Sequence, residues 1–154
     1  MSASPFPGAF PHQHHDPRGL VERINAQIRQ RIEEAAEMAA LKLLVELRQR
    51  HGQPAPETSS EADRKAFEQL ATDLLTYVRN AISAELTREQ RADLELVEAA
   101  QPESREALLL GQVSLARRLP DYWQRFEAHE AAHARARLEA PASRGSWLGR
   151  LLGS

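Results

Sequence analysis

The sequence predicts an all-α protein, built as an antiparallel helical bundle or as extended helical hairpins of about four helices. Three observations lead to this fold class. Apolar residues recur every three or four positions over long stretches, motifs of the kind that begin helices divide these stretches, and no segment alternates apolar and polar residues as a strand does. The length of 154 residues suits one domain with one hydrophobic core.

The composition indicates a thin, aliphatic core, because 42% of the residues are hydrophobic, only 5% are aromatic, and alanine is common. Such a core suits elongated helices that pack like coiled coils, side by side or against copies of themselves, so we expect a homo-oligomer. The net charge of −2 gives no general attraction to nucleic acid, which we do not expect as a partner. The absence of cysteine excludes thiol catalysis and thiolate metal sites.

The first element expected after a disordered, proline-rich arm at residues 1–17 is a long helix over about residues 18–51. The helix stop is Gly52, and a linker rich in proline, threonine and serine follows. In its second half the apolar face becomes wider than a coiled-coil seam, so the helix must be covered on more than one side. We expect this apolar surface to mediate self-association through Ile24, Ile28, Ile32, Leu43 and Leu47.

Three further helices are expected, over about residues 60–86, 87–101 and 103–139. Capping-box patterns begin the first two of these helices, and proline ends the second. The last helix must bend or split at Pro120, because proline cannot donate to the helical hydrogen-bond ladder. The helical domain therefore covers residues 18–139, and the capping patterns are Ser60-x-x-Asp63 and Thr87-x-x-Gln90.

Three aromatic residues, Tyr122, Trp123 and Phe126, follow the bend at Pro120. Beside Arg125 they could stack on nucleobases. Aromatic clusters at a bend more often fill the core of a helical protein, and this is the interpretation that we prefer.

The segment His129-Glu130-Ala131-Ala132-His133 has the spacing H-E-x-x-H. On a helix, His129 and His133 lie one turn apart, so both imidazoles could bind Zn²⁺ while Glu130 acts as the general base. The motif resembles the signature of the zincin metalloproteases, and the resemblance implies a zinc-dependent hydrolase. The next acidic residue, Glu139, points about 120° away from His133 and is a poor third ligand. A zinc hydrolase or metal-binding protein is therefore the alternative function; the preferred function needs no cofactor.

The segment Leu86-Thr87-Arg88-Glu89-Gln90 resembles the L-T-x-x-Q motif of helical periplasmic stress chaperones of the Spy type. The resemblance implies a second alternative, a stress chaperone that binds clients on apolar helix faces. A helix cap explains the same residues, because Thr87 and Gln90 stand at capping-box spacing.

The last segment, residues 140–154, is expected to be a linker followed by a short apolar docking tail. If the tail is helical, its apolar side chains share one face, opposite Arg150. The tail resembles the short peptides that load cargo proteins into encapsulin shells, which implies docking to a larger protein partner. The alternatives are a tail that folds back onto the bundle and a weak contact with a membrane surface. The residues expected to bind the partner are Trp147, Leu148, Leu151 and Leu152.

No stretch approaches the roughly 20 apolar residues of a membrane span, and the first residues lack the pattern of a signal peptide. We therefore expect a cytoplasmic protein without a transmembrane segment. The preferred function is that of a non-enzymatic binding or assembly protein, adaptor-like or scaffold-like, which self-associates and docks a larger protein partner.

Overall fold

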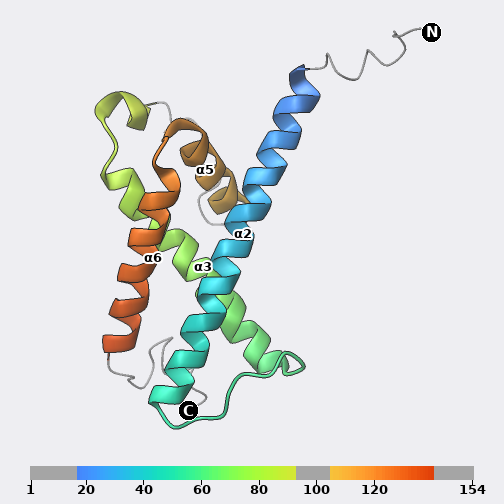
Figure 1. Cartoon of the computed structure of the whole chain (residues 1–154), viewed down its shortest axis with the longest axis vertical. Helices are drawn as coiled ribbons and strands as arrows, with labels where there is room; N and C mark the ends of the chain where they lie inside the picture. The colour runs from blue at the N-terminus through green and yellow to red at the C-terminus, as the bar shows by residue number, and fades with distance from the viewer. Residues whose placement is uncertain (1–16, 93–104, 141–154) are drawn as a thin grey trace, which may run out of the picture.

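The computed structural model describes residues 17–92 and 105–140, and all regular structure within them is helical (Figure 1). This confirms the predicted all-α fold. After the second long helix the chain is helical again from residue 88 to residue 92, where the described range ends. Most of the expected N-terminal arm and the expected C-terminal tail lie outside the described residues. The four long helices are α2 (Pro17–Arg50), α3 (Glu61–Ala84), α5 (Arg105–Arg118) and α6 (Tyr122–Glu139).

The longest helix, α2, begins at Pro17, and Gly52 stands just past its last residue, Arg50, in agreement with the preferences of helix ends. Gly52 adopts a positive φ of 65°, a conformation that costs other residues energy. The amide of Gln53 donates to the carbonyl of Arg48 at 2.8 Å, and the amide of Gly52 donates to the carbonyl of Gln49 at 3.2 Å. These are the two hydrogen bonds of a Schellman motif, which satisfies carbonyls that the helix end leaves unpaired.

The hairpin between α2 and α3 is fixed by a polar cluster around Asp63. Arg48 donates to the Asp63 carboxylate at 2.7 Å, and the backbone amide of Glu57 donates to its other oxygen, also at 2.7 Å. The amide of Asp63 donates in turn to the hydroxyl of Ser60, which caps α3. The amide of Glu57 and the guanidinium of Arg48 together lower the pKa of Asp63.

The cap expected at Thr87 is also present. The Thr87 amide donates to Gln90 Oε1 at 2.9 Å, and the Gln90 amide donates to Thr87 Oγ1 at 3.2 Å. This reciprocal pair is a capping box. It explains why the chain leaves α3 and begins a new helical stretch after residue 87.

The core lies where α3, α5 and α6 cover one side of α2. Tyr122 and Phe126 are about 1% exposed, so their predicted place in the core is confirmed. Gln112 is fully buried among apolar residues, where its amide donates to the carbonyl of Leu75 and its oxygen accepts from the Tyr122 hydroxyl. Burial raises the pKa of Tyr122. Residues on both sides of the bend are thereby tied to α3.

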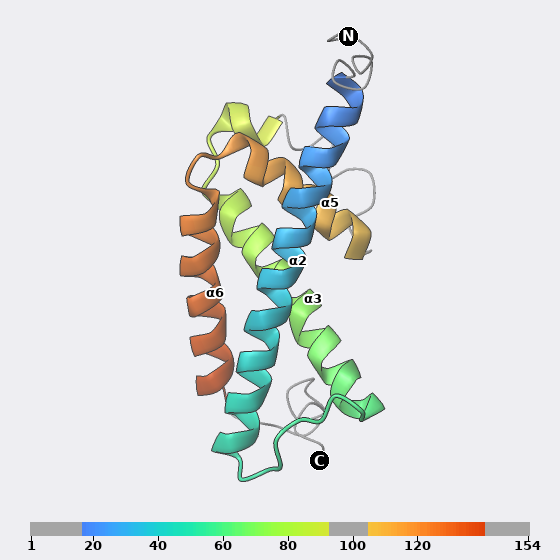
Figure 2. The ribbon, with the colours of Figure 1, turned by 45° about the vertical axis from the view of Figure 1, so that its right-hand side comes forward.

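The N-terminal end of α2 projects beyond the other helices, whereas its middle and C-terminal half are packed against them (Figures 1 and 2). This packing corrects part of the expected self-association surface. Ile32, Leu43 and Leu47 are at most 4% exposed, because they form the chain's own core with the neighbouring helices. Of the five residues expected to mediate self-association, Ile24 is exposed and Ile28 is partly buried.

Candidate functional site

Helix α2 carries apolar side chains on two opposite faces. The inner face packs in the core, and the outer face leaves large side chains in contact with solvent: Leu20 is 49%, Ile24 39%, Leu41 47% and Met38 73% exposed. At 100° per residue these four side chains and Val45 fall within an arc of about 100°, opposite the buried face. We call this set the outer stripe; it consists of Leu20, Ile24, Met38, Leu41 and Val45.

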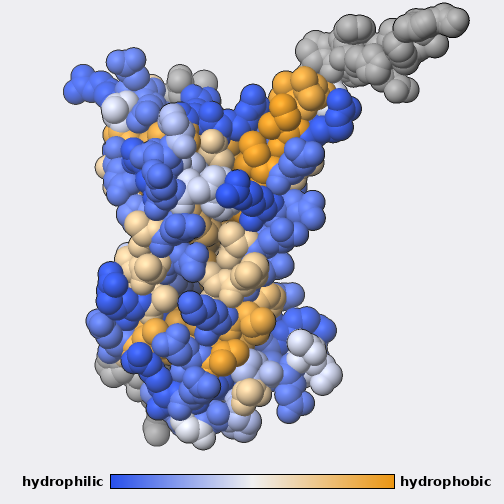
Figure 3. Space-filling model, in the orientation of Figure 1, coloured by the Kyte–Doolittle hydropathy of each residue, from blue (hydrophilic) through white to orange (hydrophobic). Residues whose placement is uncertain are grey.

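The outer stripe forms a long surface rather than a compact patch. Figure 3 shows apolar side chains on the projecting end of α2 and again over its lower half, interrupted by hydrophilic side chains. Single exposed apolar residues are normal on protein surfaces. Four of them, together with the partly buried Val45, are aligned along one helix. Such an alignment is more typical of an interface, because helices pair through apolar residues at this spacing.

The interruption in the outer stripe is made of residues that fall on the same arc, namely Gln27, Arg31 and Glu34. The Arg31 guanidinium stacks on Trp123 of α6, with Cζ 3.9 Å from the ring centroid. Glu34 accepts a hydrogen bond from Gln30 at 3.2 Å. Stacking occupies the flat face of a guanidinium, and its N–H groups still point outward in the plane, where they can pair with a carboxylate.

An apolar groove of about 270 Å³ adjoins the outer stripe at Leu41. Leu41 and Leu44 of α2 form one wall, and Pro56 and Phe67 form the other. The hairpin linker contributes Pro56, Glu57 and Thr58 to the lining of this groove. Leu41 belongs to both features, so a side chain that packs on the outer stripe would also close this groove.

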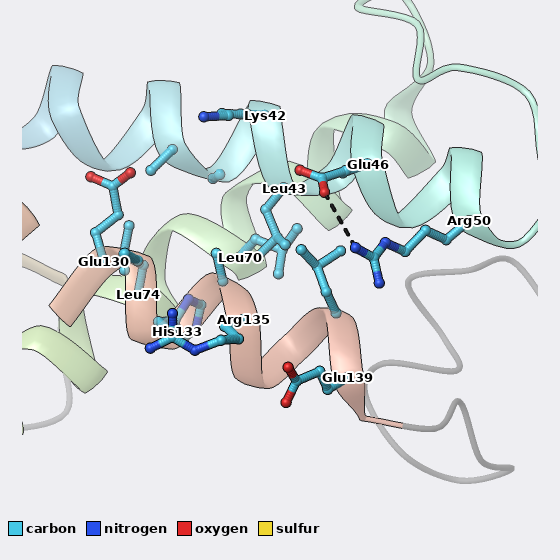
Figure 4. A pocket seen from close by; sticks show the side chains of 15 residues that line it. Lys42, Leu43, Glu46, Arg50, Leu70, Leu74, Glu130, His133, Arg135 and Glu139 are labelled. Carbon is cyan, nitrogen blue, oxygen red and sulfur yellow. Dashed lines mark ion pairs between the residues drawn. The ribbon is translucent and has the colours of Figure 1, made fainter. Parts of the chain in front are cut away.

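A second groove, of about 340 Å³, lies between α2 and α6, and Glu130, Ala131 and His133 of the H-E-x-x-H segment line it (Figure 4). Its floor is apolar, with Leu43, Leu70 and Leu74. Its rim is charged with both signs, and Glu46 pairs with Arg50 across one turn of α2 at 3.7 Å. The charged rim residues are Lys42, Glu46, Arg50, Glu130, Arg135 and Glu139.

The second histidine of that segment, His133, is 2% exposed and points toward α3. Its Nε2 atom lies 2.8 Å from Asp73 Oδ2, which also accepts from Arg137 at 2.8 Å. Its ring lies 5.2 Å from the ring of Tyr77. Burial by itself raises the pKa of Asp73, but the hydrogen bonds from His133 and Arg137 outweigh it, so the pKa is lowered overall. This partly buried cluster attaches α6 to α3.

The first histidine, His129, is held by another carboxylate. Its Nε2 atom lies 2.9 Å from Glu85, which also accepts from Arg125 at 3.0 Å. Glu130 lines the groove instead, where burial raises its pKa although Lys42 acts in the opposite direction. The described residues contain no group of three histidine, aspartate or glutamate side chains arranged to hold a metal ion. The carboxylates occupy Nε2 of both histidines, so a zinc ion held by His129 and His133 in this arrangement would have to bind their Nδ1 atoms. Zinc binding stays a hypothesis.

Two of the predicted sites can now be located, and a third cannot. The H-E-x-x-H segment lies on α6 with its histidines turned to carboxylates, and the self-association residues divide between the core and the outer stripe. The apolar tail lies outside the described residues. Sequence analysis missed Met38 and Leu41 as surface residues, although the widened apolar face of this helix was the signal that could have identified them.

Comparison with known proteins does not add to these observations. No protein-family model matches the chain, and neither curated proteins nor solved structures gave a significant match. Among the helices of the described residues, none has the length and apolar character that crossing a membrane requires. Function must therefore be inferred from the geometry and chemistry of this chain.

Proposed function

We propose that this chain is a non-enzymatic helical assembly protein, which self-associates through the outer stripe of α2 and binds a larger protein partner. The observation that carries the proposal is the exposure of Met38 and Leu41, 73% and 47%, on a long, capped helix. Because the inner face of the same helix is fully used by the core, the outer stripe is not needed for the fold of the monomer.

The energetics favour an interface on this face. Full burial of one large aliphatic side chain contributes about 1.5–3 kcal/mol, and a symmetric interface buries each side chain twice. Association costs an estimated 4–15 kcal/mol in lost freedom, so the outer stripe can support a dimer of moderate affinity. The mixed-charge grooves and the paired histidines offer no comparable support for a catalytic role.

Binding of the larger partner is assigned to the tail residues Trp147, Leu148, Leu151 and Leu152. The support is their apolar composition after a linker that begins where α6 ends, at Glu139. Deletion of residues 146–154 tests this assignment. The truncated chain should keep its helical content and its oligomeric mass, and it should no longer retain the partner that co-purifies with the full chain.

Self-association is tested by measuring the mass of the full chain in solution by light scattering over a range of concentrations. We expect an oligomer for the wild type and a monomer for the double variant Met38→Glu/Leu41→Glu. The matched control is Leu110→Glu on α5, since Leu110 is also exposed, at 52%, but lies outside the outer stripe. A wild type that stays monomeric and suppresses the aggregation of unrelated proteins would favour the chaperone alternative instead.

A further inference from the structure

We infer that the occupant of the outer stripe is a second copy of this chain, whose α2 packs antiparallel to the first with a two-fold axis between Arg31 and Glu34. The inference rests on the proposed self-association and adds its partner, direction and register. It is carried by the order of apolar and charged residues along the outer stripe, and by the way in which the other helices leave that stripe open.

The charges select the direction of the two helices. In the antiparallel pair Arg31 faces Glu34 of the partner subunit, and by symmetry Glu34 faces the partner subunit's Arg31. Two ion pairs, each between an arginine and a glutamate, therefore flank the axis. A parallel pair would place Arg31 against the same residue of its partner and Glu34 likewise, so both central contacts would be repulsive.

The apolar residues select the register. In the pairing centred on the axis, Leu20 meets Val45 of the partner subunit and Ile24 meets Leu41 of the partner subunit. Apolar layers therefore lie at both ends of the contact and a charged layer lies at its middle. Between them, Met38 meets the uncharged Gln27 of the partner subunit. Sliding one helix by seven residues in either direction would place Glu34 against an apolar side chain, where its charge would lose hydration without a partner.

The shape of the subunit fits this register. The projecting half of α2 has no α6 beside it, whereas the other half is flanked by α6 from Trp123 to Leu138 (Figures 1 and 2). The antiparallel arrangement sets the projecting half of each copy beside the flanked half of the other, over roughly 45 Å of helix. Ile24 of one copy then approaches the 270 Å³ groove beside Leu41 of the other.

The charged layer is tested by sedimentation equilibrium with two single variants of the full chain, Arg31→Glu and Glu34→Arg. Each variant alone should raise the Kd of the dimer by about tenfold or more, because each homodimer carries two like-charge contacts. An equimolar mixture should recover the dimer, since every central contact is then of opposite sign. Two unchanged homodimers, or a mixture no tighter than either variant alone, would overturn the inference.

The direction and register are tested by cross-linking. The chain has no cysteine, so Ile24→Cys and Leu41→Cys each introduce a single thiol. Oxidation of an equimolar mixture, with one variant tagged, should yield a disulfide-linked heterodimer, whereas Ile24→Cys alone should not cross-link to itself. A dimer that links residue 24 to residue 24, or that gives no heterodimer, would overturn the register and leave self-association standing. A wild-type monomer in the light-scattering experiment would remove self-association and this inference together.

Discussion

His133 on α6 and Asp73 on α3 are 60 positions apart in the sequence, yet their Nε2 and Oδ2 atoms lie 2.8 Å apart. Because an ionised carboxylate can only accept, the imidazole donates this hydrogen bond. Arg137 donates to the same carboxylate oxygen from one turn further along α6. The histidine of an apparent zinc motif is thus the buried member of a partly buried polar cluster between two helices. Its removal should lower the stability of the fold.

We predict that His133→Ala lowers the free energy of unfolding by about 2–4 kcal/mol, measured by urea denaturation followed by circular dichroism. The variant loses a buried ring and leaves Asp73 with one donor fewer. The matched control is His129→Ala, whose side chain is 19% exposed and pairs with Glu85 nearer the surface. It should cost less than about 1 kcal/mol. Equal losses in the two variants would contradict the role of His133 as a core residue.

The lowered pKa of Asp73 predicts an acid-sensitive contribution to stability. The folded state favours the ionised form of Asp73. As the pH falls past 3.8, the ordinary pKa of an aspartate, the unfolded state therefore binds more protons than the folded state does. The stabilisation that the ionised Asp73 gives to the fold is complete above that pH. It is lost as the pH falls through the lower pKa that Asp73 has in the folded state. Asp73→Asn should therefore be less stable than the wild type at pH 7. The difference between the two should shrink below about pH 4, in urea titrations at a series of pH values; a constant difference would contradict this account.

Glu130 should behave in the opposite sense, because burial raises its pKa. The folded state then disfavours the charged form, so the contribution of Glu130 to stability declines as the pH rises through the ordinary range of a glutamate. We predict that Glu130→Gln stabilises the chain at pH 7 by a few tenths of a kcal/mol, measured as an increase in the midpoint of urea denaturation. A loss of stability would indicate that the carboxylate makes a favourable contact across the groove.

The local parts of this structure could be predicted from the sequence, because the physics that determines them is local. The caps at Ser60 and Thr87 and the stop at Gly52 each depend on side chains within a few positions of the helix end. The two apolar faces of α2 could also be detected, as a widened hydrophobic pattern. Periodicity alone could not decide which face the chain itself would cover, since that depends on how α3, α5 and α6 are placed.

The candidate metal site also shows that the sequence predicts local geometry but not tertiary contacts. The spacing of His129 and His133 does place both on α6, one turn apart, as a helix requires. Their partners, Glu85 and Asp73, lie on or next to α3 and follow no pattern that links them to α6 in the sequence. A short motif predicts which side chains share a helix face. What those side chains contact depends on how the helices pack, which the motif does not show.

Two glycine variants test the balance between backbone conformation and space. Gly52→Ala should lower the free energy of unfolding by about 1 kcal/mol, because the positive φ of 65° penalises any residue with a Cβ, although nothing lies within 4 Å of the new atom. Gly111→Ala should instead raise it by about 0.5–1 kcal/mol. Gly111 is helical, and its nearest neighbour, Arg79 Cδ, would lie at an ordinary 3.8 Å.

Both glycine variants are compared with the wild type by thermal and urea denaturation at one protein concentration, so that self-association affects all three chains alike. Opposite signs for the two substitutions are expected, since the first strains the backbone and the second removes freedom from the unfolded chain. A destabilised Gly111→Ala variant would mean that α5 packs too closely on Arg79 to accept a methyl group. It would then be the close contact between α5 and α3, rather than the helix propensity of this position, that makes glycine the better residue there.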